Sequence, residues 1–237
     1  SFLFFYNYEI IFPKIEVPLV GDLFENSPII TFLFYSLCSV ILMNGNNLID
    51  GANGLMVITN LMQCLSLIVL MHFVGNFDLL SNIILLKICL LVFLLFNYPL
   101  GKIFMGDLGA YLYGFFISLI CINFFGKHPE VLSWYAILIL FYPCMELLFS
   151  FIRKKQNNLL PFDADNKHLH TLLNKKFLKL VNLNFFANSL TTLSLFIFWL
   201  TPPFWAIYFI NLNVVILILL TYIILYVLAY KLISNWS

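Results

Sequence analysis

The chain has 237 residues, of which 62% are hydrophobic and 10% charged, and its mean hydropathy is +0.99. Soluble domains are about half apolar and about a quarter charged, so this composition excludes an ordinary water-soluble fold. The net charge of +1 provides no general attraction for nucleic acid, and we expect no nucleic-acid partner.

Apolar stretches long enough to span a bilayer, about 20 residues each, recur along the chain. We predict seven, bounded by Gly, Pro, Asn or charged residues, and part of one more at residues 1–8: 28–44, 55–74, 79–98, 108–125, 131–151, 185–201 and 204–230. The fold class predicted is therefore an all-α polytopic membrane protein, in which residues 1–237 form a single transmembrane domain. The five cysteines lie within these spans without a Cys-x-x-Cys pair, which favours helix packing over disulfides or zinc binding.

The basic residues indicate how the spans are oriented. Seven of the twelve Lys and Arg residues lie between Arg153 and Lys179, in a segment (152–184) that we expect to be a loop. Basic loops next to membrane spans stay in the cytoplasm. Counting spans from this loop also places 44–54, 98–107 and the C-terminus in the cytoplasm, and places the remaining connections on the opposite side, namely 9–27, 75–78, 126–130 and 201–203.

The first of these cytoplasmic segments contains a glycine-rich motif, Asn47-Leu-Ile-Asp50-Gly-Ala-Asn53-Gly-Leu55. Asp50 and Asn53 are three residues apart, so on a helix they would share a face, where a carboxylate and an amide can hold a metal ion or a ribose hydroxyl. A glycine-rich turn capped by Asn and Asp is the alternative.

The second cytoplasmic segment has a cation five residues before a carboxylate, Lys102 and Asp107. A site for Mg²⁺ and phosphate needs oxygen ligands and a positive charge, which this pair supplies, although Asp107 could also be a simple helix N-cap. The third segment contains His168 and His170 behind two aspartates, a pattern found in phosphate sites, zinc sites and ordinary polar loops.

Taken together, these motifs resemble the polyprenyl-phosphate N-acetylhexosamine-1-phosphate transferases, which form glycosyltransferase family 4 and include phospho-N-acetylmuramoyl-pentapeptide transferase. The match follows the order of the family along nearly the whole chain: Asn47 to Leu55, Lys102 to Gly109, Glu146 followed by Arg153-Lys154, and Asp165 to His170. An ion or proton transporter is the alternative from another class, but transporters place binding groups near the midplane of the membrane.

The resemblance implies an enzyme that transfers a sugar-1-phosphate from a UDP-sugar to polyprenyl phosphate, with release of UMP. It implies Mg²⁺, or Mn²⁺ in its place, as the cofactor, Asp107 and Asp50 as metal ligands, and Asp50, Asp107, His168 and His170 as catalytic residues. It further implies a bacterial inner membrane with the active site on its cytoplasmic face, and is compatible with a homodimer. The substrate-binding residues expected by the same resemblance are Asn47, Gly51, Ala52, Asn53, Asn97, Lys102, Phe104 and Arg153.

The sequence departs from the family pattern at several positions. Asn53 stands where many members have a second Asp, Ala110 where many have Ser, Glu146 where Asp is usual, and Thr171 where some have a third His. The family's adjacent pair of aspartates on an earlier loop does not occur in this sequence. We therefore expect the sequence to lack the family's first helices, with an inactive relative as the alternative.

The predicted orientation can be tested by cysteine labelling from outside the cell. A membrane-impermeant reagent should modify a cysteine introduced at Glu25 and spare one introduced at Asn157, because the basic segment next to Asn157 stays in the cytoplasm. The reverse pattern would show that the orientation is wrong.

Overall fold

The computed structural model describes residues 11–17, 20–160, 166–181, 183–205 and 211–235, and every helix and strand assignment in these ranges is helical. The helices are α2 (Val20–Asn26), α3 (Pro28–Ile49), α4 (Leu55–Val74), α5 (Leu80–Asn97), α6 (Gly106–Lys127), α7 (Trp134–Ile139), α8 (Phe141–Gln156), α9 (Leu169–Val181), α10 (Asn184–Ser194), α11 (Phe196–Trp199), α12 (Thr201–Trp205) and α13 (Leu212–Ser234). The all-α prediction is confirmed for the described residues.

Five of these helices are long and apolar enough to cross a membrane: α3, α4, α5, α6 and α13. A sixth span is possible if α10 is joined to the helical stretch Phe196–Trp205, from which it is bent by 45°. The described residues thus form a polytopic membrane protein with five or six candidate spans, compared with the seven predicted from the sequence. The part span predicted at 1–8 lies outside the described residues.

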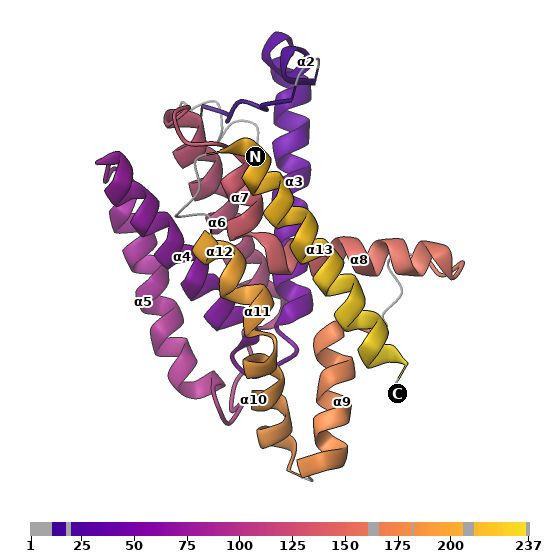
Figure 1. Ribbon diagram of the computed structural model, residues 1–237. Coiled ribbons are helices and arrows are strands. Elements are labelled where there is room, and N and C mark those ends of the chain that lie inside the picture. The colour runs from indigo at the N-terminus through magenta and orange to yellow at the C-terminus, as the bar shows by residue number, and fades with distance from the viewer. Residues whose placement is uncertain (1–10, 18–19, 161–165, 182, 206–210, 236–237) are drawn as a thin grey trace.

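The predicted span at 131–151 is wrong because the chain breaks at Leu140, between α7 and α8. Pro143 lies in the first turn of α8, where its missing N–H is tolerated, whereas within one continuous helix it would leave the carbonyl of residue 139 without a partner. Figure 1 shows α8 running across the direction of the neighbouring helices. The pattern of apolar residues correctly predicts helix here, but it does not reveal this change of direction.

Two predicted loops also contain helix. Residues 44–49, assigned to a loop, form the last turns of α3, and the 152–184 segment contains the end of α8 and the whole of α9. Residues 201–203 lie in α12, where Pro202 and Pro203 are buried, and so do not form an exposed connection.

Helices α3 to α6 run side by side, with α3 packed against α6 and α8, and α4 against α5. The α3–α4 and α5–α6 connections lie at the same end of the bundle as the turn between α9 and α10 (Figure 1). The α4–α5 connection and α2 lie at the opposite end. The α3–α4 and α5–α6 connections, which carry two of the polar motifs, are therefore brought to one end, and His170 at the start of α9 lies beside Gly51 of the first.

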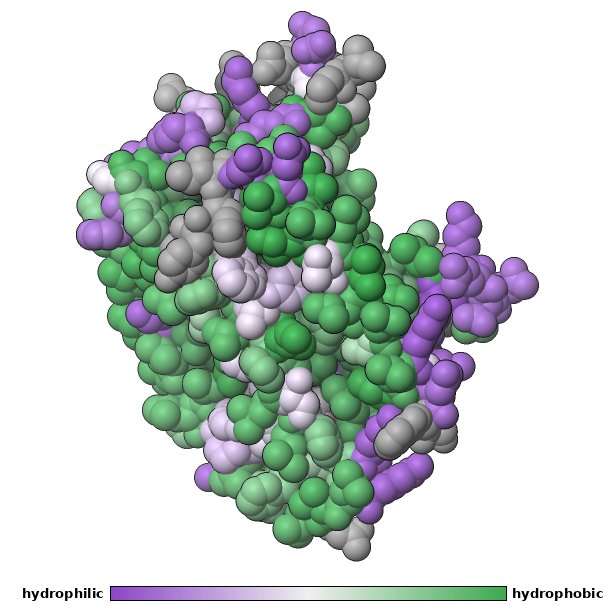
Figure 2. Space-filling view, viewed as in Figure 1, coloured by the Kyte–Doolittle hydropathy of each residue, from purple (hydrophilic) through white to green (hydrophobic). Residues whose placement is uncertain are grey.

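The molecule is apolar outside and partly polar inside, as expected in a bilayer. Figure 2 shows a surface that is largely hydrophobic across the bundle, and Leu95 on α5 is 78% exposed. Asn46, Asn60 and Gln63 are in contrast fully buried, and the amide of Asn60 donates a hydrogen bond of 2.9 Å to Oδ1 of Asn46. Such bonds help to hold membrane helices together because lipid offers polar groups no other partner.

The contact between α3 and α8 depends on a glycine. A Cβ added at Gly45 would collide with the backbone oxygen of Pro143, so no larger residue fits without moving α8. Gly45→Val should lower the free energy of unfolding by about 1–3 kcal/mol, the usual cost of overpacking a core. Thermal denaturation in detergent would measure it, with Leu37→Val on the exposed face of α3 as the control. A Gly45 variant as stable as the control would contradict the close approach.

Candidate functional site

Two carboxylates predicted to bind metal meet at the beginning of α6. The amide Nδ2 of Asn47, in the last turn of α3, donates a hydrogen bond of 2.8 Å to Oδ1 of Asp107. The backbone N–H of Gly106 donates one of 3.0 Å to Oδ2 of Asp50. Because the N-terminus of a helix carries partial positive charge and unpaired N–H groups, it favours negative groups at this position.

Asp50 is in an environment that disfavours its negative charge. Its pKa is raised to about 6, chiefly because the carboxyl group is partly buried. Hydrogen bonds from the backbone of Gly106 and Met105 act in the opposite direction, and the nearby charge of Asp107 raises the pKa further. A cation beside the two carboxylates would offset both the burial and the repulsion. Asp107, by contrast, is exposed and accessible to a ligand.

The donor set fits Mg²⁺ better than zinc. Mg²⁺ binds oxygen and commonly uses one or two carboxylates, with water and substrate phosphates completing its shell. Asp50 and Asp107 provide two such carboxylates. Within the described ranges, no group of three or more His, Cys, Asp and Glu side chains is placed to hold a metal, which a structural zinc site would require.

Asn97 positions the two loops that carry these carboxylates. Its Oδ1 accepts a 2.6 Å hydrogen bond from the backbone N–H of Gly54, and its Nδ2 donates one of 2.6 Å to the carbonyl oxygen of Ile103. Gly54 has φ +78°, a left-handed conformation that favours glycine. Asn97 is only 1% exposed. Through its two hydrogen bonds it connects the α3–α4 loop to the α5–α6 loop.

Asn53 connects the same loops to α10. Its side-chain amide donates to the carbonyl of Pro99 at 2.8 Å, its backbone N–H donates to Oδ1 of Asn188 at 2.8 Å, and its carbonyl accepts from the hydroxyl of Thr192 at 2.7 Å. Ser189 donates to the same Pro99 carbonyl at 2.6 Å. Sequence reasoning did not identify these α10 residues, although three polar side chains so close together in an apolar span were a usable signal.

The expected substrate-binding residues therefore differ in their surroundings. Gly51, Lys102 and Phe104 are exposed at the same end of the bundle as the carboxylates, where a ligand can reach them. Ala52, Asn53 and Asn97 are buried, and the two amides are hydrogen-bonded within the protein. The binding roles expected for all of these residues remain predictions.

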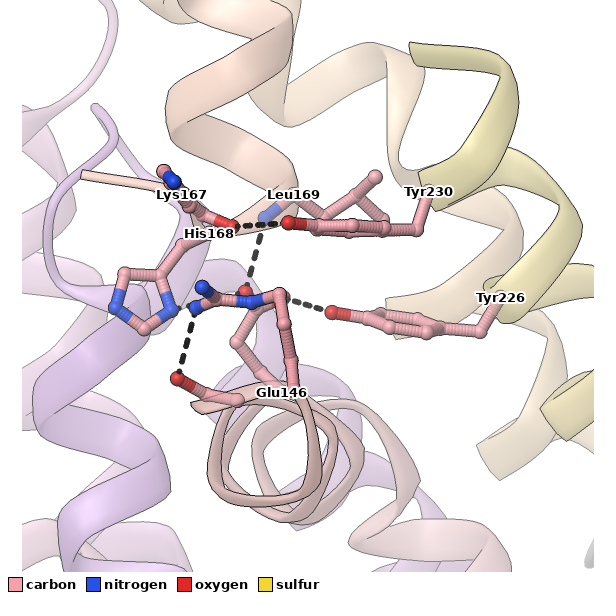
Figure 3. Close-up of polar contacts among 8 residues, drawn as sticks. Glu146, Lys167, His168, Leu169, Tyr226 and Tyr230 are labelled. Atoms are coloured by element: carbon pink, nitrogen blue, oxygen red, sulfur yellow. Dashed lines mark hydrogen bonds and ion pairs between the residues drawn. The ribbon is translucent and has the colours of Figure 1, made fainter. Parts of the chain in front are cut away.

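The histidine segment is held in place by Glu146, a fully buried residue of α8 (Figure 3). One oxygen of Glu146, Oε1, accepts the backbone N–H of Leu169 at 3.0 Å and lies 3.2 Å from Nδ1 of His168. The other, Oε2, accepts the hydroxyl of Tyr226 at 2.8 Å. Burial raises the pKa of Glu146, but the hydrogen bonds and the two histidines outweigh burial and hold the pKa below its usual value.

His170 extends this arrangement to the glycine-rich loop. Its ring is stacked on that of His168, with centroids 5.7 Å apart, and its Nε2 lies 3.0 Å from where a Cβ on Gly51 would be. Burial lowers the pKa of His170 to about 4, so the ring is neutral at pH 7. Among the residues that the structure describes, its buried Nδ1 has no hydrogen-bond partner. The structure thus brings the His-x-His motif next to Asp50-Gly51, as a shared site requires.

Arg153 lies on the α13 side of α8. Its guanidinium donates a 3.2 Å hydrogen bond to the hydroxyl of Ser150 and lies over the ring of Tyr230, 6.0 Å from the centroid. Asp163 and Asp165, which precede the histidines in the sequence, lie outside the described residues.

Comparison with known proteins supports the motif match. Residues 1–125, which include both carboxylates, match the model of glycosyl transferase family 4. The undecaprenyl-phosphate alpha-N-acetylglucosaminyl 1-phosphate transferase of Thermotoga maritima is 31% identical over 144 residues, or 61% of this chain and 43% of its own length. A probable undecaprenyl-phosphate N-acetylglucosaminyl 1-phosphate transferase of Bacillus subtilis is 33% identical over 129 residues, covering 54% of this chain and 36% of the relative.

A phospho-N-acetylmuramoyl-pentapeptide-transferase of Streptococcus equi subsp. zooepidemicus is 38% identical over 79 residues, or 33% of this chain and 24% of its own length. The chain thus spans less than half the length of the curated relatives it matches. No solved structure matches it. Because the family model matches more than half of the chain, including the segments that place Asp50 and Asp107 together, this protein belongs to glycosyl transferase family 4.

Proposed function

We propose that this protein transfers a sugar-1-phosphate, of the N-acetylhexosamine class, from a UDP-sugar to polyprenyl phosphate in a bacterial cytoplasmic membrane. The observation that carries the proposal is the placement of Asp50 and Asp107 at the N-terminus of α6, with Asn47 and the N–H of Gly106 orienting them. The named relatives support the sugar class and the lipid acceptor. The initiation of a surface glycan is the role consistent with this reaction.

The reaction exchanges one phosphorus–oxygen bond for another. An oxygen of the polyprenyl phosphate attacks the sugar-bearing phosphorus of the nucleotide, the bond from that phosphorus to the UMP oxygen breaks, and UMP leaves with the electron pair. The lipid then carries the sugar through a pyrophosphate. Phosphoryl transfer is mostly positioning and charge neutralisation, so few groups need to react covalently.

The residues of the site suit that task. Asp50 and Asp107 would hold Mg²⁺, which supplies positive charge to the phosphates when bound. Lys102 is exposed at the same end of the bundle and can neutralise a further phosphate oxygen. The Nδ1 of His170, which has no hydrogen-bond partner within the described ranges, can donate to a phosphate oxygen or accept from a hydroxyl of the nucleotide sugar, depending on its tautomer. His168 is held at Nδ1 by Glu146, and its ring is stacked on that of His170.

The carboxylate assignment predicts a difference between two conservative variants of the full-length enzyme. Asp107→Asn should abolish UMP release from UDP-N-acetylglucosamine and undecaprenyl phosphate, because the amide keeps the size but loses the charge that binds Mg²⁺. Glu146→Gln should reduce turnover less, since Glu146 acts through His168.

The control for this pair is Asp78→Asn, which removes a carboxylate in the α4–α5 connection at the other end of the bundle and should leave turnover unchanged. The measurement is UMP release across a magnesium titration. Wild-type activity of Asp107→Asn at every Mg²⁺ concentration would refute the assignment.

The histidine assignment predicts a loss of turnover without a loss of fold. His168→Ala or His170→Ala should lower turnover by roughly ten- to a thousandfold, the effect of losing one charge-stabilising donor. The thermal stability of each purified variant should not change on adding a zinc chelator. If chelation instead destabilises the wild type and activity follows zinc content, the histidines form a zinc site and the phosphate assignment is wrong.

A further inference from the structure

We propose that a basic groove between α8, α9 and α13 binds the headgroup of an anionic phospholipid. The groove has a volume of about 720 Å³. Half of the residues that line it are cations, and none of those lining it in the described ranges is acidic: Arg153, Asn157, Lys167, Leu172, Lys175, Lys176, Leu178, Lys179, Tyr230 and Ser234. This concentration of charge is unusual in a chain in which only 10% of residues are charged.

The end of α13 places the groove at the membrane surface. This apolar helix has 23 residues, so it is about 34 Å long, slightly more than the roughly 30 Å hydrocarbon core of a bilayer. Its last turns, from Tyr230 to Ser234, therefore emerge among the lipid headgroups, where tyrosine is favoured. Leu228 and Leu232 beside them are 51% and 66% exposed and can contact the acyl chains of the same lipid.

Charge and shape favour a phosphate-bearing ligand. Guanidinium and ammonium groups bind phosphate oxygens strongly, and clusters of Lys and Arg next to a membrane span attract anionic lipids. Figure 2 shows hydrophilic residues gathered along one edge of the molecule, directly beside a hydrophobic surface. A lipid with a negative headgroup and two acyl chains matches both surfaces, whereas a soluble nucleotide would use only the basic one.

The groove includes Arg153, one of the residues expected to bind substrate, but it lies away from the carboxylates and the histidines. In Figure 3, His168 lies on one side of Glu146, and Tyr226 and Tyr230 lie on the other. The hydroxyl of Tyr230 donates a 3.1 Å hydrogen bond to the carbonyl of Lys167, so a lipid bound at Tyr230 would steady the segment that leads into His168. Binding in this groove does not depend on the transfer reaction proposed above.

The test compares lipid retention by the full-length protein and by a triple variant, Lys175→Gln/Lys176→Gln/Lys179→Gln. Native mass spectrometry in detergent would be run with phosphatidylglycerol and with phosphatidylcholine of the same acyl chains. The wild type should retain phosphatidylglycerol selectively, and the triple variant should bind it at least tenfold more weakly. Replacement of the same lysines by arginine should preserve binding, and Lys14→Gln/Lys127→Gln, outside the groove, should behave as wild type.

Equal retention of phosphatidylglycerol by the wild type and the triple variant would overturn the proposal. So would displacement of the lipid by millimolar inorganic phosphate or UMP, which would assign the groove to a soluble phosphate. Thermal stability in phosphatidylcholine shows whether the triple variant is folded. If it is not, Lys179→Gln alone, an exposed position on α9, provides the comparison and should still weaken phosphatidylglycerol binding.

Discussion

The buried carboxylate of Glu146 is the interaction on which the arrangement of the site depends. It accepts hydrogen bonds from Leu169 at the start of α9 and from Tyr226 on α13, and it lies beside the ring of His168. Burying a carboxylate is costly unless it is hydrogen-bonded, and the N–H of Leu169 and the hydroxyl of Tyr226 supply such bonds to Glu146. The position of both histidines follows from this requirement, because α9 begins where Glu146 accepts its backbone N–H.

The break between α7 and α8 makes this contact possible. One straight helix over residues 131–151 would carry Glu146 parallel to the other helices of the bundle. Because the chain breaks at Leu140, Glu146 instead lies on α8, which runs across the bundle (Figure 1). The closeness of Gly45 to Pro143 fixes where α8 crosses α3. The same change of direction carries the basic end of α8 toward α9 and α13, where Arg153 lines the basic groove. One proline-containing turn thus determines the surroundings of both the histidines and the groove.

Hydrogen bonds from asparagine side chains hold the loops of the site together. Asn97 bonds to the α3–α4 and α5–α6 loops, and Asn53 bonds to the second of these loops and to α10. Because Asn53 and Asn97 are buried, these bonds pair polar groups that water does not reach. They leave the exposed Asp107 and the half-buried Asp50 at the N-terminus of α6. There the two carboxylates would attract a cation, and the partial positive charge of the helix N-terminus would attract a phosphate.

The sequence alone determined the membrane class, the helical character and the two carboxylate segments, because these depend on local composition and on short motifs around Asp50 and Asp107. It also indicated that the polar segments share one end, since each span reverses the direction of the chain. It did not determine the number of spans, the break at Leu140 or the contacts of Asn188 and Thr192. Those depend on how helices distant in the sequence pack against one another. The partners of Glu146, 22 to 80 residues away along the chain, were decided only by the tertiary structure, because a buried charge selects its neighbours in space.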